Sequence, residues 1–133
     1  MNLRSIKISE TVHVALRWLS YLAKNKNQKP QSLGEFAIEE NISFYFLQQI
    51  SRLLKKGGLI KSKLGNWGGY QLAKPANKIT LEEIIESLEG PISLINCANH
   101  QCPNHQCEQK NAWERINREM KKIFSRVKLS DLI

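Results

Sequence analysis

Three evenly spaced cysteines have the most distinctive chemistry in this sequence. Cys97, Cys102 and Cys107 are each separated by four residues, and the stretch between them also contains His100 and His105. Three thiolates on one loop can converge on iron or zinc, because each is a soft ligand and the polar neighbours impose no competing packing. The spacing therefore favours an iron–sulfur cluster, of the 2Fe–2S or the 4Fe–4S type. Its fourth ligand must be a residue other than cysteine or an external group.

Two alternatives to a cluster stay open for this segment. A structural zinc site usually contains a Cys-x2-Cys pair, which is absent here, although an imidazole from His100 or His105 would complete a set of three cysteines and one histidine. Redox-active or inert thiols would need no metal. Residues 96–110 contain almost no apolar side chains, so they cannot form a core of their own. Other elements must therefore position the thiols.

The charged residues are distributed unevenly along the chain. The 20 lysines and arginines outnumber the 12 acidic residues, which gives a net charge of +8, and no acidic residue occurs from Asn41 to Leu81. A concentrated positive field favours an anionic partner such as nucleic acid, the alternative being a solvated basic face without a partner. The basic residues of this acid-free stretch are Arg52, Lys55, Lys56, Lys61, Lys63, Lys74 and Lys78.

The first half of the sequence predicts three helices. Apolar residues at helical spacing indicate a helix over Ser9–Ala23. Ser32 followed by Glu35 has the form of a capping box, which would satisfy two free backbone donors and start a short second helix. Ser43 can cap a third helix that ends at Gly57-Gly58. Two short helices separated by a tight turn predict a helix-turn-helix.

A β-hairpin and a fourth helix follow in the predicted order. Leu59–Ser62 and Tyr70–Ala73 have strand-like patterns, and the glycine-rich loop between them can turn sharply. Thr80 and Glu83 form a second capping box at the start of the next helix, which Gly90 ends. The predicted fold class is therefore mainly α with a small β-hairpin, that is, a winged helix-turn-helix.

The last amphipathic segment predicts a long C-terminal helix over Asn111–Lys128. Because this helix follows a polar segment, we expect its apolar stripe to lie on a second subunit, although packing on its own domain is the alternative. The expected domains are a DNA-binding unit (1–91), a cysteine-bearing loop (92–110) and a dimerisation helix with a tail (111–133). The predicted dimer residues are Trp113, Ile116, Met120, Ile123, Phe124 and Val127.

The third helix and the hairpin carry the candidate DNA contacts. A recognition helix presents polar or basic side chains to base edges and phosphates while its other face packs on the core. Glutamine can pair with adenine, and arginine with guanine or phosphate. The alternatives are an ordinary amphipathic surface helix and a tryptophan that caps the core. The candidates are Ser43, Tyr45, Gln48, Gln49 and Arg52 on the helix, and Lys61, Lys63, Asn66 and Trp67 on the hairpin.

Other classes of protein fit the sequence poorly. No run of about 18 apolar residues is present, and the N-terminus lacks the apolar stretch of a signal peptide, so we expect a cytoplasmic protein with no membrane partner. The sequence contains no nucleotide-binding glycine motif, no His-Glu-x-x-His and no paired acid and base outside the cysteine segment. We therefore do not expect an enzyme.

Taken together, these motifs resemble the Rrf2 family of transcription regulators over essentially the full length. The resemblance implies a homodimer that binds a near-palindromic double-stranded DNA operator, with long C-terminal helices crossing at the dimer interface and an iron–sulfur cluster in the loop before them. Such members sense cluster supply, iron, nitric oxide or redox state. The matching segments are His13–Arg17, Ile42–Gln49, Gly68–Pro75, Ile79–Leu81, Leu88–Pro91, the three-cysteine loop and Leu129–Leu132.

The sequence departs from the family pattern at the fourth cluster ligand. In the branch of cluster-biogenesis regulators this ligand is a histidine three residues after the last cysteine, a position occupied here by Lys110. In the nitric oxide branch it is an acidic residue early in the partner's first helix, and His13 occupies that position. Imidazole is a competent ligand, so we hypothesise that His13 of one subunit completes the cluster of the other. A plain surface histidine, His100 and His105 are the alternatives.

Two other functions remain as alternatives to a cluster-sensing regulator. One is a winged-helix regulator whose loop holds zinc or responds through thiol oxidation, which keeps the DNA-binding half and changes only the sensor. The other is a small metal- or cluster-handling protein, which would need neither a recognition helix nor an acid-free stretch. The spacings between the cysteines are also one residue shorter than is common in the family.

Overall fold

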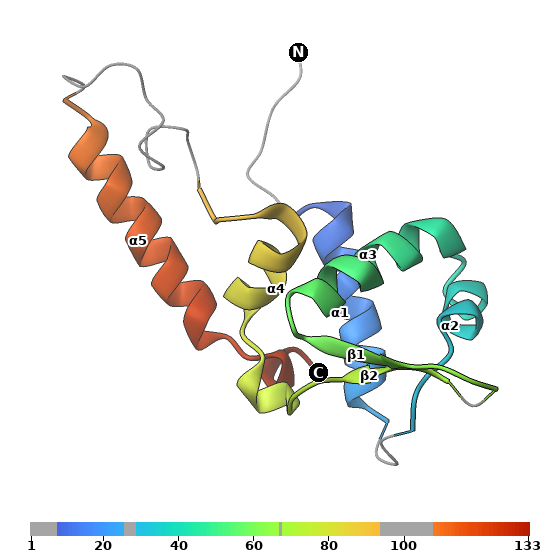
Figure 1. The fold of residues 1–133 in the computed structure, drawn as a ribbon. Coiled ribbons are helices and arrows are strands. Elements are labelled where there is room, and N and C mark those ends of the chain that lie inside the picture. Colours follow the sequence, from blue (N-terminus) through green and yellow to red (C-terminus); the bar gives the residue numbers. More distant parts are fainter. Residues whose placement is uncertain (1–7, 26–28, 67, 94–107) are drawn as a thin grey trace.

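Five α-helices and one antiparallel hairpin make up the described part of the chain, which is residues 8–25, 29–66, 68–93 and 108–133 of a computed structural model (Figure 1). The predicted class, mainly α with a small hairpin, is confirmed. The elements are α1 (Glu10–Ala23), α2 (Leu33–Glu39), α3 (Phe44–Lys56), β1 (Ile60–Lys63), β2 (Gly69–Leu72), η1 (Ala76–Lys78), α4 (Leu81–Glu89), α5 (Lys110–Arg126) and η3 (Leu129–Leu132).

Hydroxyl side chains cap four of these helices. The caps Ser32, Ser43 and Thr80 were predicted from the sequence, whereas Ser9 was predicted to be the first residue of its helix. The hydroxyl oxygens of Ser9, Ser32 and Ser43 each accept a hydrogen bond from the backbone three residues on, which satisfies a donor that the helix itself cannot pair. At the start of α4, Thr80 and Glu83 form the complete capping box. For Ser32 only the serine half of the predicted box is present among the described residues.

The strands are each displaced by one residue from their predicted bounds. In the observed register, Ile60 pairs with Leu72 and Lys63 pairs with Gly69. Leu59 was predicted to begin the first strand, but its side chain turns into the core ahead of β1. Its carbonyl oxygen still accepts a hydrogen bond from the Ala73 N–H at 3.0 Å, so the pairing continues just beyond the named strands.

An aromatic cluster around Trp18 holds α1, α2 and the hairpin together. The Trp18 ring is fully buried, and its centroid lies 4.8 Å from that of Phe36, 5.8 Å from that of Tyr21 and 6.3 Å from that of Tyr70. Such pairs add to the stabilisation that burial of the rings already provides. The helix-turn-helix and the hairpin therefore share one core.

The base of the hairpin is also tied to the segment before α2. The Gln31 N–H donates to the Tyr70 carbonyl oxygen at 2.8 Å, and the Tyr70 N–H donates to the Gln31 carbonyl oxygen at 2.9 Å. Gly69 lies so close to Gln31 that a Cβ atom there would overlap with the Gln31 backbone, and its φ of 154° is one that other residues rarely adopt. Only glycine fits at this position.

The C-terminal end of the chain returns to the core. Helix α5 ends at Arg126, two residues before the predicted Lys128, because Val127 adopts an extended conformation and the next residues form backbone bonds with a neighbouring segment. The Leu81 N–H donates to the Val127 carbonyl oxygen at 2.9 Å, and the Leu129 N–H donates to the Ile79 carbonyl oxygen at 2.8 Å. Leu129 is completely buried. This pairing fixes where α5 leaves the domain.

None of the helices within the described ranges is both long and apolar enough to cross a bilayer.

The buried end of the chain generates a stability prediction. Replacing Leu129 by alanine should lower the free energy of unfolding by about 2–5 kcal/mol, because a large buried side chain is lost and a cavity remains. Leu132 lies in the same η3 turn and is 44% exposed, so Leu132→Ala is the matched control and should change stability by less than about 1 kcal/mol. Urea unfolding followed by circular dichroism measures both. Equal losses would contradict the anchoring role of Leu129.

The capping box at α4 also binds a lysine that follows the hairpin. Lys74 Nζ lies 2.7 Å from Glu83 Oε1, while the Thr80 N–H donates to Glu83 Oε2 at 2.9 Å. Partial burial by itself raises the pKa of the Glu83 carboxyl group. The hydrogen bonds from Lys74 and Thr80, together with the positive charge of Lys74, lower the pKa by more than burial raises it. The pKa of Glu83 therefore lies below its ordinary value of 4.5.

The lowered pKa of Glu83 predicts a pH-dependent contribution to stability. Ionised Glu83 stabilises the fold above pH 4.5, and this contribution is lost as the pH falls through the lower pKa of the folded state. Glu83→Gln should therefore lower the melting temperature near neutral pH, and the difference from wild type should shrink in acid. Glu82→Gln removes the same charge from the same turn without removing these bonds and should show a smaller difference. A pH-independent effect of Glu83→Gln would contradict the assignment.

Candidate nucleic-acid interface

Helix α3 divides sharply into a buried face and a polar face. Its buried face packs Leu47, Ile50 and Leu54 into the core. Its opposite face exposes Tyr45, Gln48 and Arg52, and Ser43 is exposed at the N-cap, as the sequence predicts. A helix fixed on one side by the core and polar on the other can enter the major groove of DNA without losing its packing.

Two of the predicted contact residues are joined to each other. Arg52 Nη2 donates a hydrogen bond to Gln49 Oε1 at 2.5 Å, and Gln49 is only partly exposed. This bond uses one of the two lone pairs of Gln49 Oε1, the atom that would accept a hydrogen bond from adenine in a bidentate contact. Gln48 is exposed one position earlier, so the two glutamines have different surroundings although the sequence did not distinguish them.

The hairpin lies beside α3 and is fixed to it. Lys55, in the last turn of the helix, donates from Nζ to Ser62 Oγ on β1 at 2.7 Å. Lys61, Lys63 and Asn66 are all exposed on the hairpin, as predicted. Trp67 lies outside the described residues. The polar face of α3 and the basic hairpin thus form one surface.

One exposed residue of this surface was missed by the sequence analysis. Leu64 is 94% exposed at the end of β1, where the chain turns. A signal was present in the sequence, since an apolar residue interrupts an otherwise polar loop between Lys63 and Gly65. Architectural proteins insert apolar side chains of this kind between base steps.

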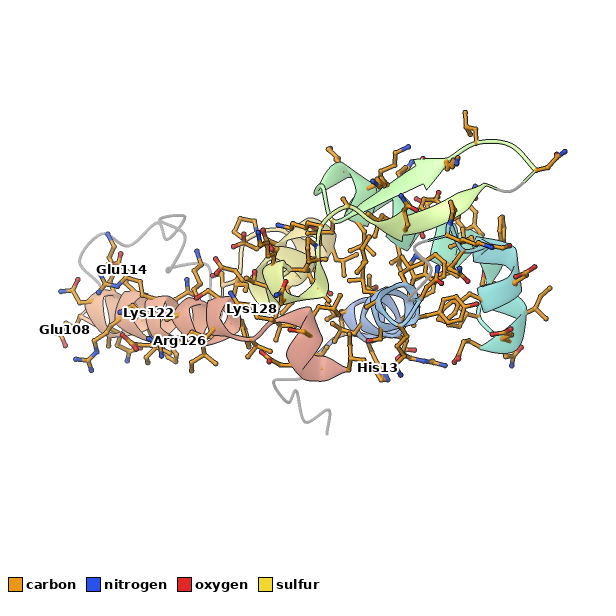
Figure 2. The ribbon with its side chains drawn as sticks, turned by 90° about the horizontal axis from the view of Figure 1, so that it is seen from below. His13, Glu108, Glu114, Lys122, Arg126 and Lys128 are labelled. Carbon is orange, nitrogen blue, oxygen red and sulfur yellow. The ribbon has the colours of Figure 1, made fainter. Side chains whose placement is uncertain are left out.

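The predicted dimer stripe divides between two environments. Met120 and Phe124 pack against the chain's own cluster of Val12, Ile85 and Ile92. Trp113 Nε1 donates to Gln109 Oε1 at 3.3 Å, one turn earlier. Ile116 and Ile123 remain 42% and 57% exposed on α5, which projects from the domain in Figure 2. Val127 lies beyond the end of the helix.

The candidate metal ligands fall mostly on a segment that is not described. Cys97, Cys102 and Cys107, like His100 and His105, lie outside the described residues. His13 is exposed on α1 (Figure 2). It lines a groove of about 470 Å³ together with Leu132 and Ile133. Within the described ranges, no three histidine, cysteine or acidic residues are grouped as a metal site would require. The ligand set therefore stays a prediction from the sequence.

Comparison with known proteins identifies the family of this fold. A model of the Rrf2 family, described as an iron-dependent transcriptional regulator, matches residues 8–133. The chain belongs to the Rrf2 family. It is similar to the transcriptional regulator CymR of Bacillus subtilis, with 34% identity over 127 residues that cover 96% of this chain and 89% of CymR. It is also similar to the regulator NsrR of Halalkalibacterium halodurans, with 31% identity that covers 72% of this chain and 66% of that protein.

Solved structures of Rrf2 proteins share the fold. The structure of CymR from B. subtilis, titled the global cysteine regulator, matches with a TM-score of 0.78 and 33% identity over 96% of both chains. The structure of IscR from T. potens matches with a TM-score of 0.74 and 28% identity, covering 96% of this chain and 85% of that one. This Rrf2 protein is thus a winged-helix transcriptional regulator with DNA as its partner, and it is not an enzyme.

The exposed guanidinium of Arg52 generates a prediction for this Rrf2 protein. Arg52→Gln should weaken binding to a duplex selected from a random pool and should lower the slope of log K against log salt by about 0.9 per subunit, because one phosphate or base contact is lost. Arg115→Gln makes the same charge change on α5 and is the control, which should leave the slope nearly unchanged. Fluorescence anisotropy across a salt series measures both. Equal slopes for Arg52→Gln and wild type would show that α3 does not lie on the DNA.

Proposed function

We propose that this chain is a homodimeric, sequence-specific regulator that binds a near-palindromic operator and senses iron–sulfur cluster status, iron, nitric oxide or redox state through its three cysteines. One observation carries the DNA-binding part. The polar face of α3 and the basic hairpin lie side by side and are joined by the Lys55–Ser62 hydrogen bond. Both belong to the stretch without acidic residues, so nothing within it repels a phosphate backbone.

Each part of this surface has its own role on DNA. Ser43 and Tyr45, at the N-terminal end of α3, approach the bases first, and Gln48 pairs with adenine in the major groove. Arg52, held by Gln49, contacts guanine or phosphate. The hairpin binds the backbone or the minor groove with the side chains of Lys61, Lys63, Asn66 and Trp67.

Dimerisation sets the distance between the two recognition helices. The exposed apolar residues Ile116 and Ile123 are one heptad apart on α5, which is the spacing at which two helices pack against each other. A two-fold axis between paired α5 helices would place the two α3 helices on successive major grooves. A near-palindromic operator matches that symmetry.

The donor set fits an iron–sulfur cluster. Cys97, Cys102 and Cys107 would supply three thiolates, and His13 of the other subunit would supply an imidazole from the exposed face of α1. A bound cluster supplies a group that oxygen, nitric oxide and iron depletion can alter. The family description as iron-dependent and the similarity to IscR and NsrR support this assignment.

The position of the cysteines along the chain connects the sensor to the dimer. They lie between the end of α4 at Glu89 and the start of α5 at Lys110. A group bound by the three thiols would therefore act on both helices. Because residues 127–129 bind the residues that precede and begin α4, a shift of α5 would be passed to the domain that carries α3. Sensing would thus change how the two recognition helices are spaced.

A regulator whose loop holds zinc or responds by thiol oxidation is the second candidate. The similarity to CymR, whose structure is titled that of a cysteine regulator, favours it over a metal carrier. Thiols can form disulfides or sulfenic acids without any metal. In this case the α3 surface keeps its role and only the sensing chemistry changes.

The sensor assignment is tested on protein purified without oxygen. We expect broad visible absorption with iron and sulfide in matching amounts, and we expect Cys102→Ala to lose that absorption while its far-ultraviolet circular dichroism stays unchanged. His13→Ala should shift or weaken the bands, whereas His100→Ala and His105→Ala should not.

The other outcomes each overturn part of the proposal. Stoichiometric zinc in a colourless sample would make the loop a zinc site, and a metal-free protein after reconstitution would leave thiol oxidation as the sensor. Retained absorption in Cys102→Ala would remove that residue from the ligands. An effect of His100→Ala or His105→Ala in place of His13→Ala would move the fourth ligand into the loop.

A further inference from the structure

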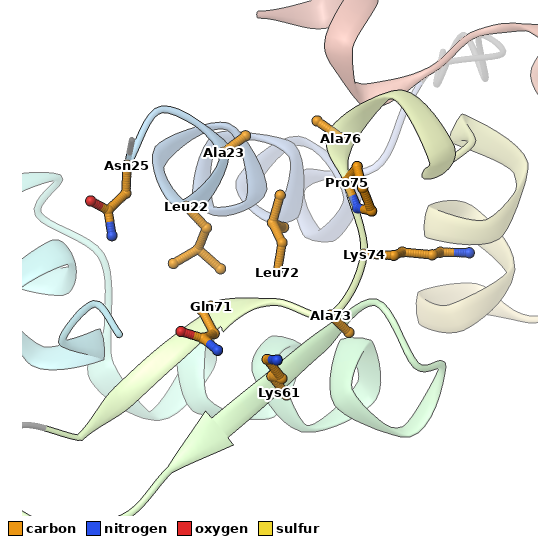
Figure 3. Close-up of a pocket in the computed structure, with 10 residues that line it drawn as sticks. All are labelled: Leu22, Ala23, Asn25, Lys61, Gln71, Leu72, Ala73, Lys74, Pro75 and Ala76. Atoms are coloured by element: carbon orange, nitrogen blue, oxygen red, sulfur yellow. The ribbon is translucent and has the colours of Figure 1, made fainter. Parts of the chain in front are cut away.

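A second cavity lies between the C-terminal end of α1 and the hairpin, away from the cysteine segment in the sequence (Figure 3). Its volume is about 440 Å³, which lies within the range of about 300–1,000 Å³ that is common for small-molecule sites. Its walls come from α1, β1, β2 and the connection that leads to η1. None of the roles proposed above uses this space.

The helix side of the cavity is apolar. Leu22 and Ala23 belong to the last turn of α1, and Leu72 and Ala76 face them from β2 and η1 (Figure 3). Leu22 is almost fully buried, so the wall that it forms is held by the core behind it. A hydrocarbon group packed on this wall would exclude water chiefly from Ala23, Leu72 and Ala76, which are partly exposed, at a favourable free energy.

The hairpin side of the cavity is polar and positively charged. Lys61 and Gln71 are paired residues on the two strands, and both line the cavity (Figure 3). None of the described residues that line it is acidic. Lys74 contributes the stem of its side chain, because its ammonium group is bound to Glu83 of α4 at 2.7 Å. Lys61 also takes part in interactions within the protein. Its ammonium group has three N–H donors, so it can bind a ligand carboxylate in addition to those partners.

These two sides define the ligand and its orientation. We propose that the cavity binds a small organic monoanion, a carboxylate with a compact branched hydrocarbon group, and that this ligand weakens DNA binding. The carboxylate lies at Lys61 and Gln71, while the hydrocarbon group lies on Leu22 and Leu72. This orientation keeps the negative group away from the end of α1, whose carbonyl oxygens carry partial negative charge.

Lys61 connects the cavity to the DNA surface. This regulatory part rests on the proposed function, in which Lys61 contacts DNA from the hairpin. A carboxylate bound to Lys61 neutralises one of the charges that face the phosphates, so each subunit loses about one ionic contact. The expected result is a loss of about five- to tenfold in affinity per contact at about 0.1 M salt, with a smaller salt slope. By linkage, DNA must weaken binding of the ligand by the same factor.

Four probes separate charge from shape in calorimetric titrations of the full chain without DNA. Isovalerate has both the carboxylate and the branched hydrocarbon group. Isovaleramide lacks the charge, acetate lacks the hydrocarbon group, and inorganic phosphate has charge alone. We expect isovalerate to bind more than tenfold more tightly than the other three, with a dissociation constant in or below the millimolar range. Equal binding of phosphate and isovalerate, or no binding of isovalerate at about 20 mM, would overturn the site.

Two lysines on the same strand give the matched variants. Lys61 and Lys63 are both exposed on β1, but only Lys61 lines the cavity. Lys61→Met should abolish isovalerate binding, whereas Lys63→Met should retain it, and both should weaken DNA binding to a similar degree. Isovalerate should then weaken the DNA binding of Lys63→Met and wild type but not that of Lys61→Met. Anisotropy with the selected duplex measures this effect.

The outcomes distinguish failure of the site from failure of the proposed function. If both variants weaken DNA binding but isovalerate does not bind to wild type, the cavity proposal is wrong and the DNA surface stands. If isovalerate binds and depends on Lys61, while neither variant changes DNA binding, the site stands and the hairpin is not a DNA contact. Binding that Lys63→Met abolishes equally would mean a diffuse attraction to the basic hairpin and would overturn the site.

Discussion

The short backbone pairing between residues 79–81 and 127–129 is the constraint on which the arrangement of this protein depends. It joins the residues that precede and begin α4 to the residues that follow α5, and it buries Leu129 beside Ile79 in the core. Two hydrogen bonds alone contribute little net stability, but the buried leucine makes their breakage unfavourable. Helix α5 therefore projects from the domain in a fixed direction, although much of its surface is exposed. In a dimer formed through such a helix, a shift of α5 would carry the attached domain with it.

Helix α4 links the hairpin, which we propose to bind DNA, to the segment with the three cysteines, which we propose as the sensor. Its first turn binds Lys74 through Glu83, and Lys74 follows β2 of the hairpin closely. Its last turn leads into the segment that carries the cysteines. The helix is only nine residues long and packs against α1, α3 and α5, so it cannot move without disturbing its neighbours. The cavity beside Lys61 is lined by residues of the hairpin and not by residues of α4. A ligand in it would therefore act on the hairpin directly, without a movement of α4.

Local signals allowed much of the fold to be predicted from the sequence. Ser43, Thr80 and the glycines after α3 act through their nearest neighbours, so the sequence alone determines their effect. The bond between Lys74 and Glu83 and the early end of α5 at Arg126 depend on contacts between distant segments, which no local pattern records. For the same reason the apolar stripe of α5 predicted a single face, whereas Met120 turns to its own domain and Ile123 does not. The exposure of Tyr45, Gln48 and Arg52 on α3 was predictable because polar and charged side chains favour the surface, whereas the exposure of Leu64 was not.

The close approach of Gly69 to the Gln31 backbone means that the base and the tip of the hairpin tolerate sequence changes to different degrees. At its base the Gln31 backbone leaves no room for a Cβ atom, so the register there is fixed by sterics rather than by the turn. At its tip, Leu64 is open to solvent and a Cβ atom at Gly65 would meet no other atom within 4 Å, so only the φ of 111° at Gly65 favours glycine there. Insertions and deletions can therefore accumulate at the tip while the base and the core beneath it stay unchanged. The reach of the hairpin across DNA can thus diverge between related regulators faster than the fold that supports it.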